Sequence, residues 1–170
     1  MTAMKRAEEP DGNGWSFISP THGAVSFNDL FERVVEYVEE GPSFRHTLII
    51  GSDSYAADET VFVTAVVIHR VGCGGRYFYK KQRHRKMKSM RQRIYHETSL
   101  SLELAALLCE RVDENGCSPL PLEIHLDVGA KGASREMVRE VVGMVTGSGF
   151  AAVTKPNAYG AMSVADRHSR

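Results

Sequence analysis

The stretch Thr47-Leu48-Ile49-Ile50-Gly51-Ser52-Asp53 decides the fold of this chain. Its near-continuous apolar run predicts a strand that is buried on both faces and therefore lies in the middle of its sheet. Asp53 ends the run, where an isolated carboxylate would either cost several kcal/mol or become protonated. A metal ion, a hydrogen-bonded turn or solvent could each remove that penalty. Taken alone, Asp53 could therefore be either a ligand or a turn residue.

The segments around this run indicate an α/β fold. A helix over 27–40 precedes it, with Ser26 as its cap and Gly41-Pro42 as its stop. The apolar and β-branched stretches after the run predict further strands at Thr60–Arg70, Arg76–Lys80, Leu122–Asp127 and Ala151–Thr154. Helical spacing predicts helices over about 91–112, 134–146 (capped by Ser134) and around 163–167. This order predicts a five-stranded mixed sheet flanked by helices.

Length and composition exclude several classes of protein. A chain of 170 residues can bury a core without disulfides or structural metals. Residues 1–14 are expected to form a flexible leader, followed by a single domain over residues 15–170. No apolar run is long enough to span a bilayer. The three cysteines, Cys73, Cys109 and Cys117, lack metal-ligand spacing, which favours a reducing cytoplasm.

Three further acidic residues accompany Asp53. Asp127 ends the fourth predicted strand, so adjacent parallel strands would bring the two aspartates together. Glu97 projects onto the core-facing stripe of the long helix, whereas Glu103 falls on nearly the opposite side, where a solvated charge is the usual explanation. Asp166 lies in the last helix, where pairing with a nearby arginine is a strong alternative.

Carboxylates gathered at one end of a sheet repel one another, and hard divalent cations relieve that repulsion. Mg²⁺ and Mn²⁺ prefer oxygen ligands and keep waters for substrate phosphates. Two such ions about 4 Å apart can activate a water and stabilise the leaving oxygen in phosphodiester hydrolysis. The pattern therefore predicts a site for Mg²⁺ or Mn²⁺.

The order of elements resembles the ribonuclease-H-like superfamily, and more narrowly the YkuK-like family of predicted RNase H-like proteins. The residues that carry the resemblance are Ile49–Ser54, Tyr95–Leu100, His125–Gly129, and Lys155-Pro156 with Ser163–Arg167. The resemblance implies that Asp53 bridges the metals, that Glu97 and Asp127 are further ligands, and that Asp166 is the C-terminal ligand. Glu103 remains the alternative to Glu97. The Asp-Gly pair common on the first strand of ribonucleases H is Asp53-Ser54 here.

A basic segment follows the third predicted strand. It contains no acidic residue, and the residues expected to contact nucleic acid are Lys80, Lys81, Arg83, Arg85, Lys86, Lys88 and Arg91. Such side chains neutralise phosphates, and Tyr77 and Tyr79 could stack on exposed bases. A solvated loop is the alternative. Lys155, near the end of the fifth predicted strand, could also reach a phosphate, but no role is assigned to it.

The favoured function is a divalent-metal-dependent nuclease that hydrolyses phosphodiester bonds in RNA, an RNA–DNA hybrid or structured DNA. A non-catalytic nucleic-acid-binding protein on the same fold is the main alternative, because fold does not fix function. A scaffold that assembles through its sheet edge is a third reading.

Overall fold

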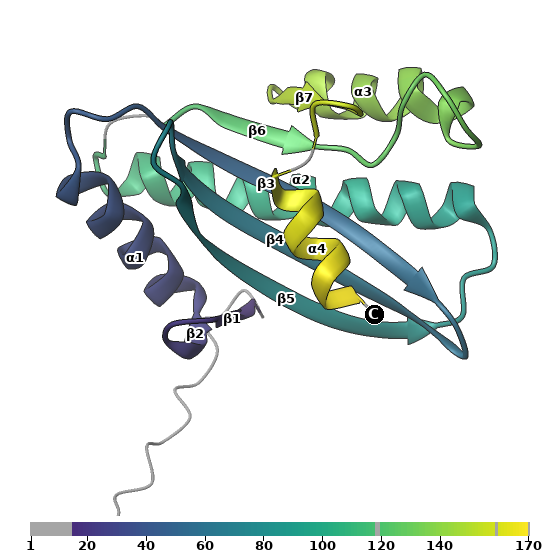
Figure 1. The fold of residues 1–170 in the computed structure, drawn as a ribbon, viewed down its shortest axis with the longest axis horizontal. Coiled ribbons are helices and arrows are strands. Elements are labelled where there is room, and N and C mark those ends of the chain that lie inside the picture. The colour runs from purple at the N-terminus through teal and green to yellow at the C-terminus, as the bar shows by residue number, and fades with distance from the viewer. Residues whose placement is uncertain (1–14, 118–119, 159, 170) are drawn as a thin grey trace, which may run out of the picture.

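The computed structural model describes residues 15–117, 120–158 and 160–169, except the side chains of Met162 and Asp166. The expected leader over residues 1–14 lies outside the described residues. Figure 1 shows a long twisted sheet with helices on both sides. The strands are β1 (Ser16–Ser19), β2 (Gly23–Ser26), β3 (His46–Ala56), β4 (Glu59–Arg70), β5 (Gly75–Arg85), β6 (Leu122–His125) and β7 (Ala151–Val153). The helices are α1 (Phe27–Glu40), α2 (Met90–Glu114), the 3-10 turn η1 (Arg135–Met137), α3 (Val138–Gly147) and α4 (Gly160–Ser169).

The sheet has the strand order β2-β1-β5-β4-β3-β6-β7. The β3–β4–β5 meander is antiparallel, whereas β6 pairs parallel with β3 and β7 pairs parallel with β6. The predicted mixed α/β sheet is confirmed, and its five expected strands form the contiguous block from β5 to β7. The β1–β2 hairpin extends this block to seven strands.

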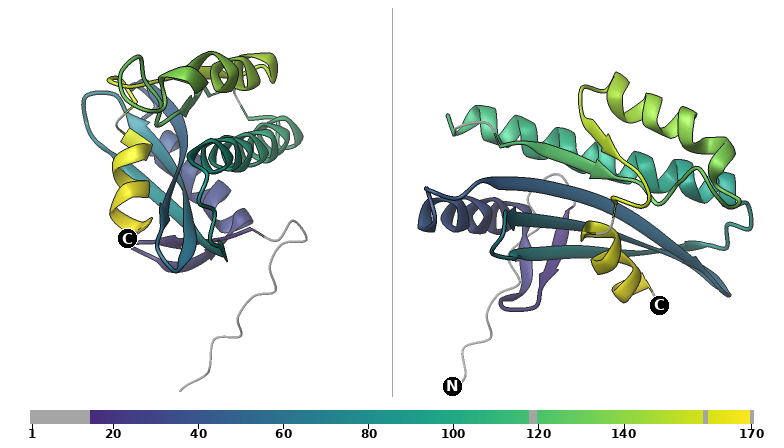
Figure 2. Two further views of the ribbon diagram at one scale, coloured as in Figure 1. Left: turned by 90° about the vertical axis from the view of Figure 1, so that its right-hand side faces the viewer. Right: turned by 45° about the horizontal axis from the view of Figure 1, so that its top comes forward.

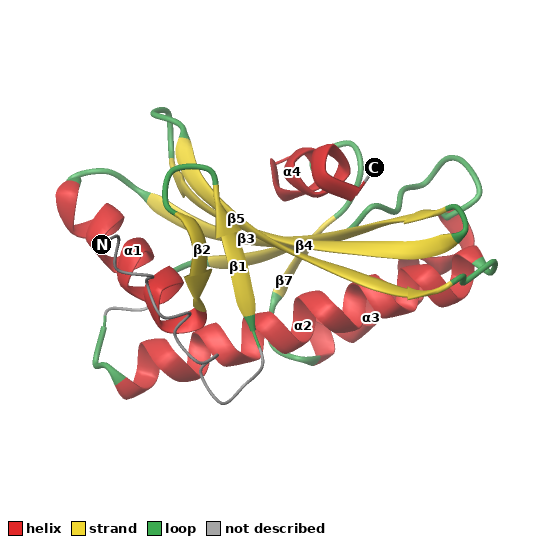
Figure 3. Cartoon of the chain, turned by 90° about the horizontal axis from the view of Figure 1, so that it is seen from below, coloured by secondary structure: helices red, strands yellow, loops and turns green. Residues whose placement is uncertain are grey.

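Two layers of helix bury the centre of the sheet. Figure 3 shows α1, α2 and α3 on one side of the sheet and α4 on the other, and the side view in Figure 2 shows the same division. The larger core lies on the α1–α2 side and includes Ile50, Val66 and Leu104, all fully buried. A smaller core joins Ile49, Val63 and Ala65 to Ala161 and Ala165 of α4. Because β3 contributes to both cores, its sequence is apolar at successive positions.

Local signals fix the ends of the first two helices. Ser26 and Asp29 form a capping box at the start of α1, in which the Asp29 amide donates to Ser26 Oγ at 3.1 Å. Ser89 caps α2 by accepting from the Gln92 amide at 3.2 Å. Gly41 ends α1 where the Arg70 guanidinium lies 2.8 Å from the position of a hypothetical Cβ, so a larger residue would collide with it.

Several predicted boundaries differ from the structure. The strand β5 continues through the basic segment to Arg85, because every residue from Gly75 to Arg85 pairs with β4. The strand β3 continues past Asp53 to Ala56, and β6 ends at His125 rather than at Asp127. Ser134 precedes the 3-10 turn η1, and its side chain makes no capping hydrogen bond, so its predicted role as a cap is wrong.

Candidate functional site

The candidate site forms where the parallel strands β3 and β6 part. Their pairing runs from Leu48–Leu122 to Gly51–His125, and β3 then continues for five more residues beside β4. Asp53 is half-buried on this continuation, and Asp127 lies two residues beyond the end of β6. Ligand sites of open α/β sheets gather at the carboxyl ends of parallel strands. The topology therefore brings both aspartates to one end of the sheet.

Glu97 reaches this end of the sheet from α2 and is only 9 % exposed. Ser54, the residue after Asp53, donates a hydrogen bond from Oγ to Glu97 Oε1. Burial raises the pKa of Glu97, and the negative charges of Asp53 and Asp127 act in the same direction. Against the lowering effects of the Ser54 hydrogen bond and Arg93, the pKa reaches about 8. The Glu97 carboxyl is therefore largely neutral at pH 7, so the three acids need not all be charged together.

Asp127 forms an ion pair with Lys155. The Lys155 Nζ lies 2.7 Å from Asp127 Oδ1, and both side chains are partly exposed. The Lys155 amide donates to the Val128 carbonyl at 2.9 Å, which holds the chain after β7 beside the chain after β6. Gly129 leaves space for the lysine, because a Cβ there would lie 3.0 Å from Lys155 Cβ. The backbone of two neighbouring strand ends thus sets the position of this pair.

A cavity of about 280 Å³ opens beside these side chains. It is lined by the acids Asp53, Glu97 and Asp127, and by residues of the 131–134 loop. Its basic lining residues are Arg93, Lys131 and Lys155. Arg93 Nε is buried and has no hydrogen-bond partner among the described residues. The cavity therefore combines three carboxyl groups with three cationic groups.

The donor chemistry of the cavity fits a hard divalent cation, because its acidic side chains offer only oxygen ligands. In the arrangement of the described residues, however, no group of three or more His, Cys, Asp or Glu side chains is placed to hold a metal ion. At Asp127, Oδ1 is in contact with the Lys155 ammonium group. The three acids are thus neighbours without forming a ready-made metal cage.

The two remaining acidic candidates have different outcomes. Asp166 lies in α4, but its side chain is outside the described residues, so its role as a ligand stays a prediction. Glu103 is exposed on α2, and its charge acts on Lys80 and His96. Since Glu97 lines the cavity and Glu103 is not among the lining residues described, Glu97 is the better placed of the two helix glutamates.

The basic segment divides between the two faces of the sheet. Lys81, Arg83 and Arg85 alternate along β5 on the face that α4 partly covers, and all three are exposed. We refer to them as the basic stripe. The cross-strand register aligns Lys81 with Val63 and Asp53, and Arg83 with Val61 and Tyr55. Lys81 is thus two strands from Asp53, about 10 Å across the sheet.

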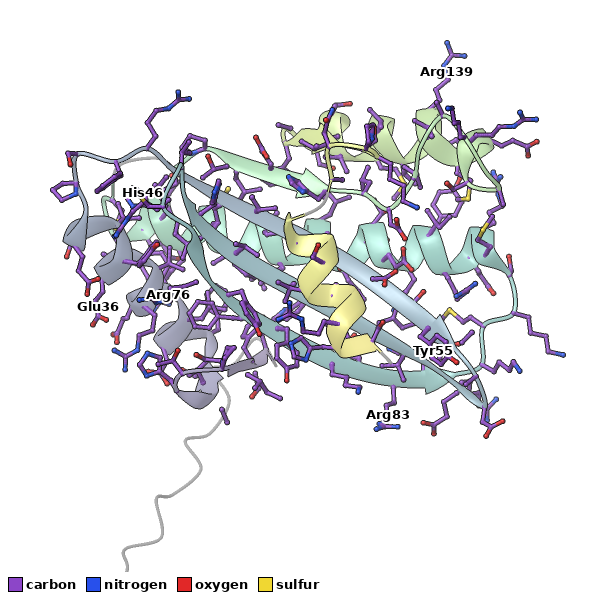
Figure 4. All side chains as sticks on the ribbon, in the orientation of Figure 1. Glu36, His46, Tyr55, Arg76, Arg83 and Arg139 are labelled. Atoms are coloured by element: carbon purple, nitrogen blue, oxygen red, sulfur yellow. The ribbon has the colours of Figure 1, made fainter. Side chains whose placement is uncertain are left out.

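Figure 4 shows Tyr55 and Arg83 on the part of the sheet beyond the end of α4. Tyr55 is 45 % exposed, so a large aromatic side chain accompanies the basic stripe. Glu59 lies opposite Arg85 and forms an exposed ion pair with Arg83 at 3.4 Å. Such surface pairs contribute little and are readily exchanged for other partners.

Two of the other basic residues of the segment have local partners. Lys80 points to the opposite face, where its Nζ lies 4.4 Å from the centre of the Trp15 ring. Arg91 pairs with Glu140 of α3 at 2.9 Å. Lys86 and Lys88 are exposed in the loop before α2. The seven residues therefore do not form one continuous patch.

The two tyrosines expected to stack on bases are packed against α4. His168 stacks on Tyr79 with ring centres 3.8 Å apart, and Tyr77 Oη lies 3.5 Å from His168 Nε2. Burial lowers the pKa of His168, with the charges of Arg167 and Lys81 acting in the same direction. Tyr77 and Tyr79 thus hold the C-terminal helix in this structure, and Tyr55 is the aromatic residue beside the stripe.

Sequence reasoning left Lys155 unassigned and omitted Arg93 from the site. The Lys155-Pro156 motif was visible, but pairing with Asp127 depends on the parallel register of β6 and β7. Arg93 belongs to the basic segment, and only its place on α2, one turn before Glu97, brings its charge to the cavity.

Comparison with known proteins agrees with this architecture. A family model described as Ribonuclease H-like matches residues 29–170, and the chain belongs to this family. It is similar to the protein of Bacillus subtilis (strain 168) named "Uncharacterized protein YkuK", with 33 % identity over 168 residues. That similarity covers 91 % of this chain and 96 % of the relative, which confirms the YkuK-like resemblance. No solved structure matches the chain. No helix among the described residues is long and apolar enough to cross a membrane.

Proposed function

We propose that this protein is a divalent-metal-dependent nuclease whose active site is the cavity between Asp53, Glu97 and Asp127. The observation that carries the proposal is the convergence of these acids from β3, α2 and the segment after β6 on one cavity of about 280 Å³. The membership of the Ribonuclease H-like family supports a nuclease or nucleic-acid-binding function. The expected substrate is RNA, an RNA–DNA hybrid or structured DNA.

Asp53, Glu97 and Asp127 would hold Mg²⁺ or Mn²⁺, with Asp166 as a further candidate ligand. The cation would supply activation of a water and stabilisation of the leaving oxygen. Glu97 would give up the proton on its carboxyl group to become a ligand, since a cation favours the charged form. Arg93 favours the same charged form from its place near Glu97.

The basic stripe gives the proposed substrate a route to the cavity. Its three side chains lie about 7 Å apart along one strand, because alternate residues share a face. They project from the same face as Asp53 and can neutralise successive phosphates of a nucleic acid. Tyr55 lies two residues after Asp53 on β3 and projects from the same face of the sheet. A base could stack on its ring there.

The test is cleavage of labelled RNA, hybrid and DNA in Mg²⁺ and in Mn²⁺ by the wild type and Asp53→Asn. We expect the variant to lose at least about 100-fold in rate, because even changes outside the ligand shell cost about 10–100-fold. Asp58→Asn, which changes an exposed aspartate on the neighbouring β3–β4 turn, is the matched control and should cleave normally.

Undiminished cleavage by a folded Asp53→Asn variant would refute the assignment. Nucleic-acid binding without cleavage by the wild type would instead favour the non-catalytic alternative. In that case Lys86→Glu with Lys88→Glu should impair binding, and Asp53→Asn should not.

A further inference from the structure

We propose that this cavity is a binding site for the terminal phosphate of a nucleic-acid strand, held by Arg93, Lys131 and the loop that carries Lys131. The inference rests on the proposed function only in taking a nucleic acid as the ligand, and it requires no bound cation. Its starting observation is that Arg93, Lys131 and Lys155 line the cavity together with the three carboxyl groups. Such cationic groups repel a metal ion and attract an anion.

Two of the three carboxyl groups in the lining already have partners on this chain. Lys155 Nζ lies 2.7 Å from Asp127 Oδ1, and Ser54 donates a hydrogen bond to Glu97. Among the described residues, no group of three or more His, Cys, Asp or Glu side chains is placed to hold a metal ion. The Lys155 ammonium group offsets the charge of Asp127, which lets an anion approach the other cationic groups.

Arg93 carries the clearest sign of a missing anionic partner. Its Nε is buried and has no hydrogen-bond partner among the described residues. An unpaired buried donor costs free energy, and a phosphate oxygen would accept a charge-assisted hydrogen bond from it. Arg93 forms no ion pair in the described part of the chain, although its charge acts on Glu97, one turn further along α2. A guanidinium group is well suited to phosphate, because its planar set of N–H donors matches two phosphate oxygens at once.

The 131–134 loop brings further donors to the lining of the cavity. Lys131 is exposed and forms no ion pair with another described residue. The chain turns at Gly132 with a φ of 83°, and a Cβ there would meet nothing within 4 Å, so the space beside the loop is open. The Ser134 hydroxyl makes no capping hydrogen bond to η1. The loop therefore offers an ammonium group and a hydroxyl group to a ligand in the cavity.

The charge of these groups favours a terminal phosphate over an internal one. A phosphate monoester carries about 1.5 to 2 negative charges near neutral pH, whereas an internal phosphodiester carries one. Arg93 and Lys131 supply one positive charge each, besides Lys155, which is paired with Asp127. The basic stripe on β5 would hold internal phosphates of the same strand. The proposed nuclease therefore acts at the ends of strands.

The experiment compares the binding of three internally labelled single strands of one sequence to the full chain, by fluorescence anisotropy in EDTA. One strand carries a 5′-phosphate, one a 3′-phosphate and one hydroxyl groups at both ends. We expect one of the phosphorylated strands to bind at least about tenfold more tightly than the hydroxyl strand, because charge-assisted hydrogen bonds are the strong ones. Inorganic phosphate should abolish this preference, and chloride at equal ionic strength should not.

Two substitutions test the residues that are proposed to hold the phosphate. Arg93→Met and Lys131→Met should each remove most of the preference for the phosphorylated strand. Arg139→Met removes an exposed charge of α3 from outside the lining of this cavity and should keep the preference. Circular dichroism checks that each variant is folded. Because Lys131 is exposed, its replacement tests the inference even where Arg93→Met does not fold.

Equal binding of the three strands by the wild type would overturn the inference, as would a preference that survives in Lys131→Met and in a folded Arg93→Met. An effect of inorganic phosphate no larger than that of chloride would overturn it as well. Metal-dependent cleavage that Asp53→Asn abolishes would still support the proposed function in each of these cases. Conversely, a phosphate preference in a protein that cleaves none of the substrates would support the inference and count against the nuclease.

Discussion

Glu97 makes the stability of the protein depend on pH in a way that one substitution should remove. The side chain is buried, and its pKa is raised from 4.5 to about 8. Since the folded protein binds this proton more tightly than the unfolded chain, the stabilisation is fully present below pH 4.5 and is lost as pH rises toward 8. At about 1.4 kcal/mol per pH unit, the loss across this interval is on the order of 5 kcal/mol.

Glu97→Gln should therefore flatten the pH dependence of the free energy of unfolding. The glutamine is neutral at every pH and keeps an oxygen that can accept from Ser54, so the variant should gain on the order of 3 kcal/mol over the wild type at pH 7. The assay is urea unfolding followed by circular dichroism from pH 5 to 9, without divalent ions. Glu103→Gln, an exposed glutamate on the same helix, should keep the wild-type slope. Parallel curves for the wild type and Glu97→Gln would refute the reasoning.

Two further predictions concern the face of the sheet that α4 partly covers. Arg83→Ala with Arg85→Ala should weaken binding to single-stranded nucleic acid and lower the slope of log K against log salt by about 1.4, since each phosphate contact contributes about 0.7. Arg139→Ala, an exposed arginine on α3 (Figure 4), is the control, and an unchanged slope in the double variant would exclude the stripe from the interface. His168→Ala removes the stack on Tyr79 and should cost about 1 kcal/mol. Hydrogen exchange in α4 should then increase about fivefold while α2 is unaffected, and equal protection in both proteins would contradict the role of His168 as an anchor.

The central part of the fold could be predicted because its signals are local. The apolar run at Thr47–Asp53 requires cover on both faces, and Ser26 with Asp29 marks the start of α1. The β1–β2 hairpin gave a weaker signal, since each strand has only four residues and its register with β5 consists of the single pair Ile18–Tyr79. The length of β5 was underestimated because pairing with β4 outweighs the low strand preference of its lysines and arginines.

The sequence predicts the acidic residues of the candidate site but not the basic residues beside them. Asp53 and Asp127 were identified because each ends a predicted strand, and Glu97 because it projects onto the apolar stripe of its helix. The partners of these acids come from segments far away in sequence, so no spacing reveals them. Lys155 reaches Asp127 through the pairing of β6 with β7, and Tyr79 is covered because α4 folds back over β5.

The charge distribution also explains how three acids can lie together before any cation binds. Glu97 avoids repulsion by holding a proton, with its Oε1 satisfied by Ser54. Asp127 avoids it by pairing with Lys155. Asp53 is half-buried and borders the cavity. A cation that binds all three must release the Glu97 proton and share Asp127 with the lysine. The pH dependence of unfolding without divalent ions therefore reports the proton that Glu97 holds before any cation binds.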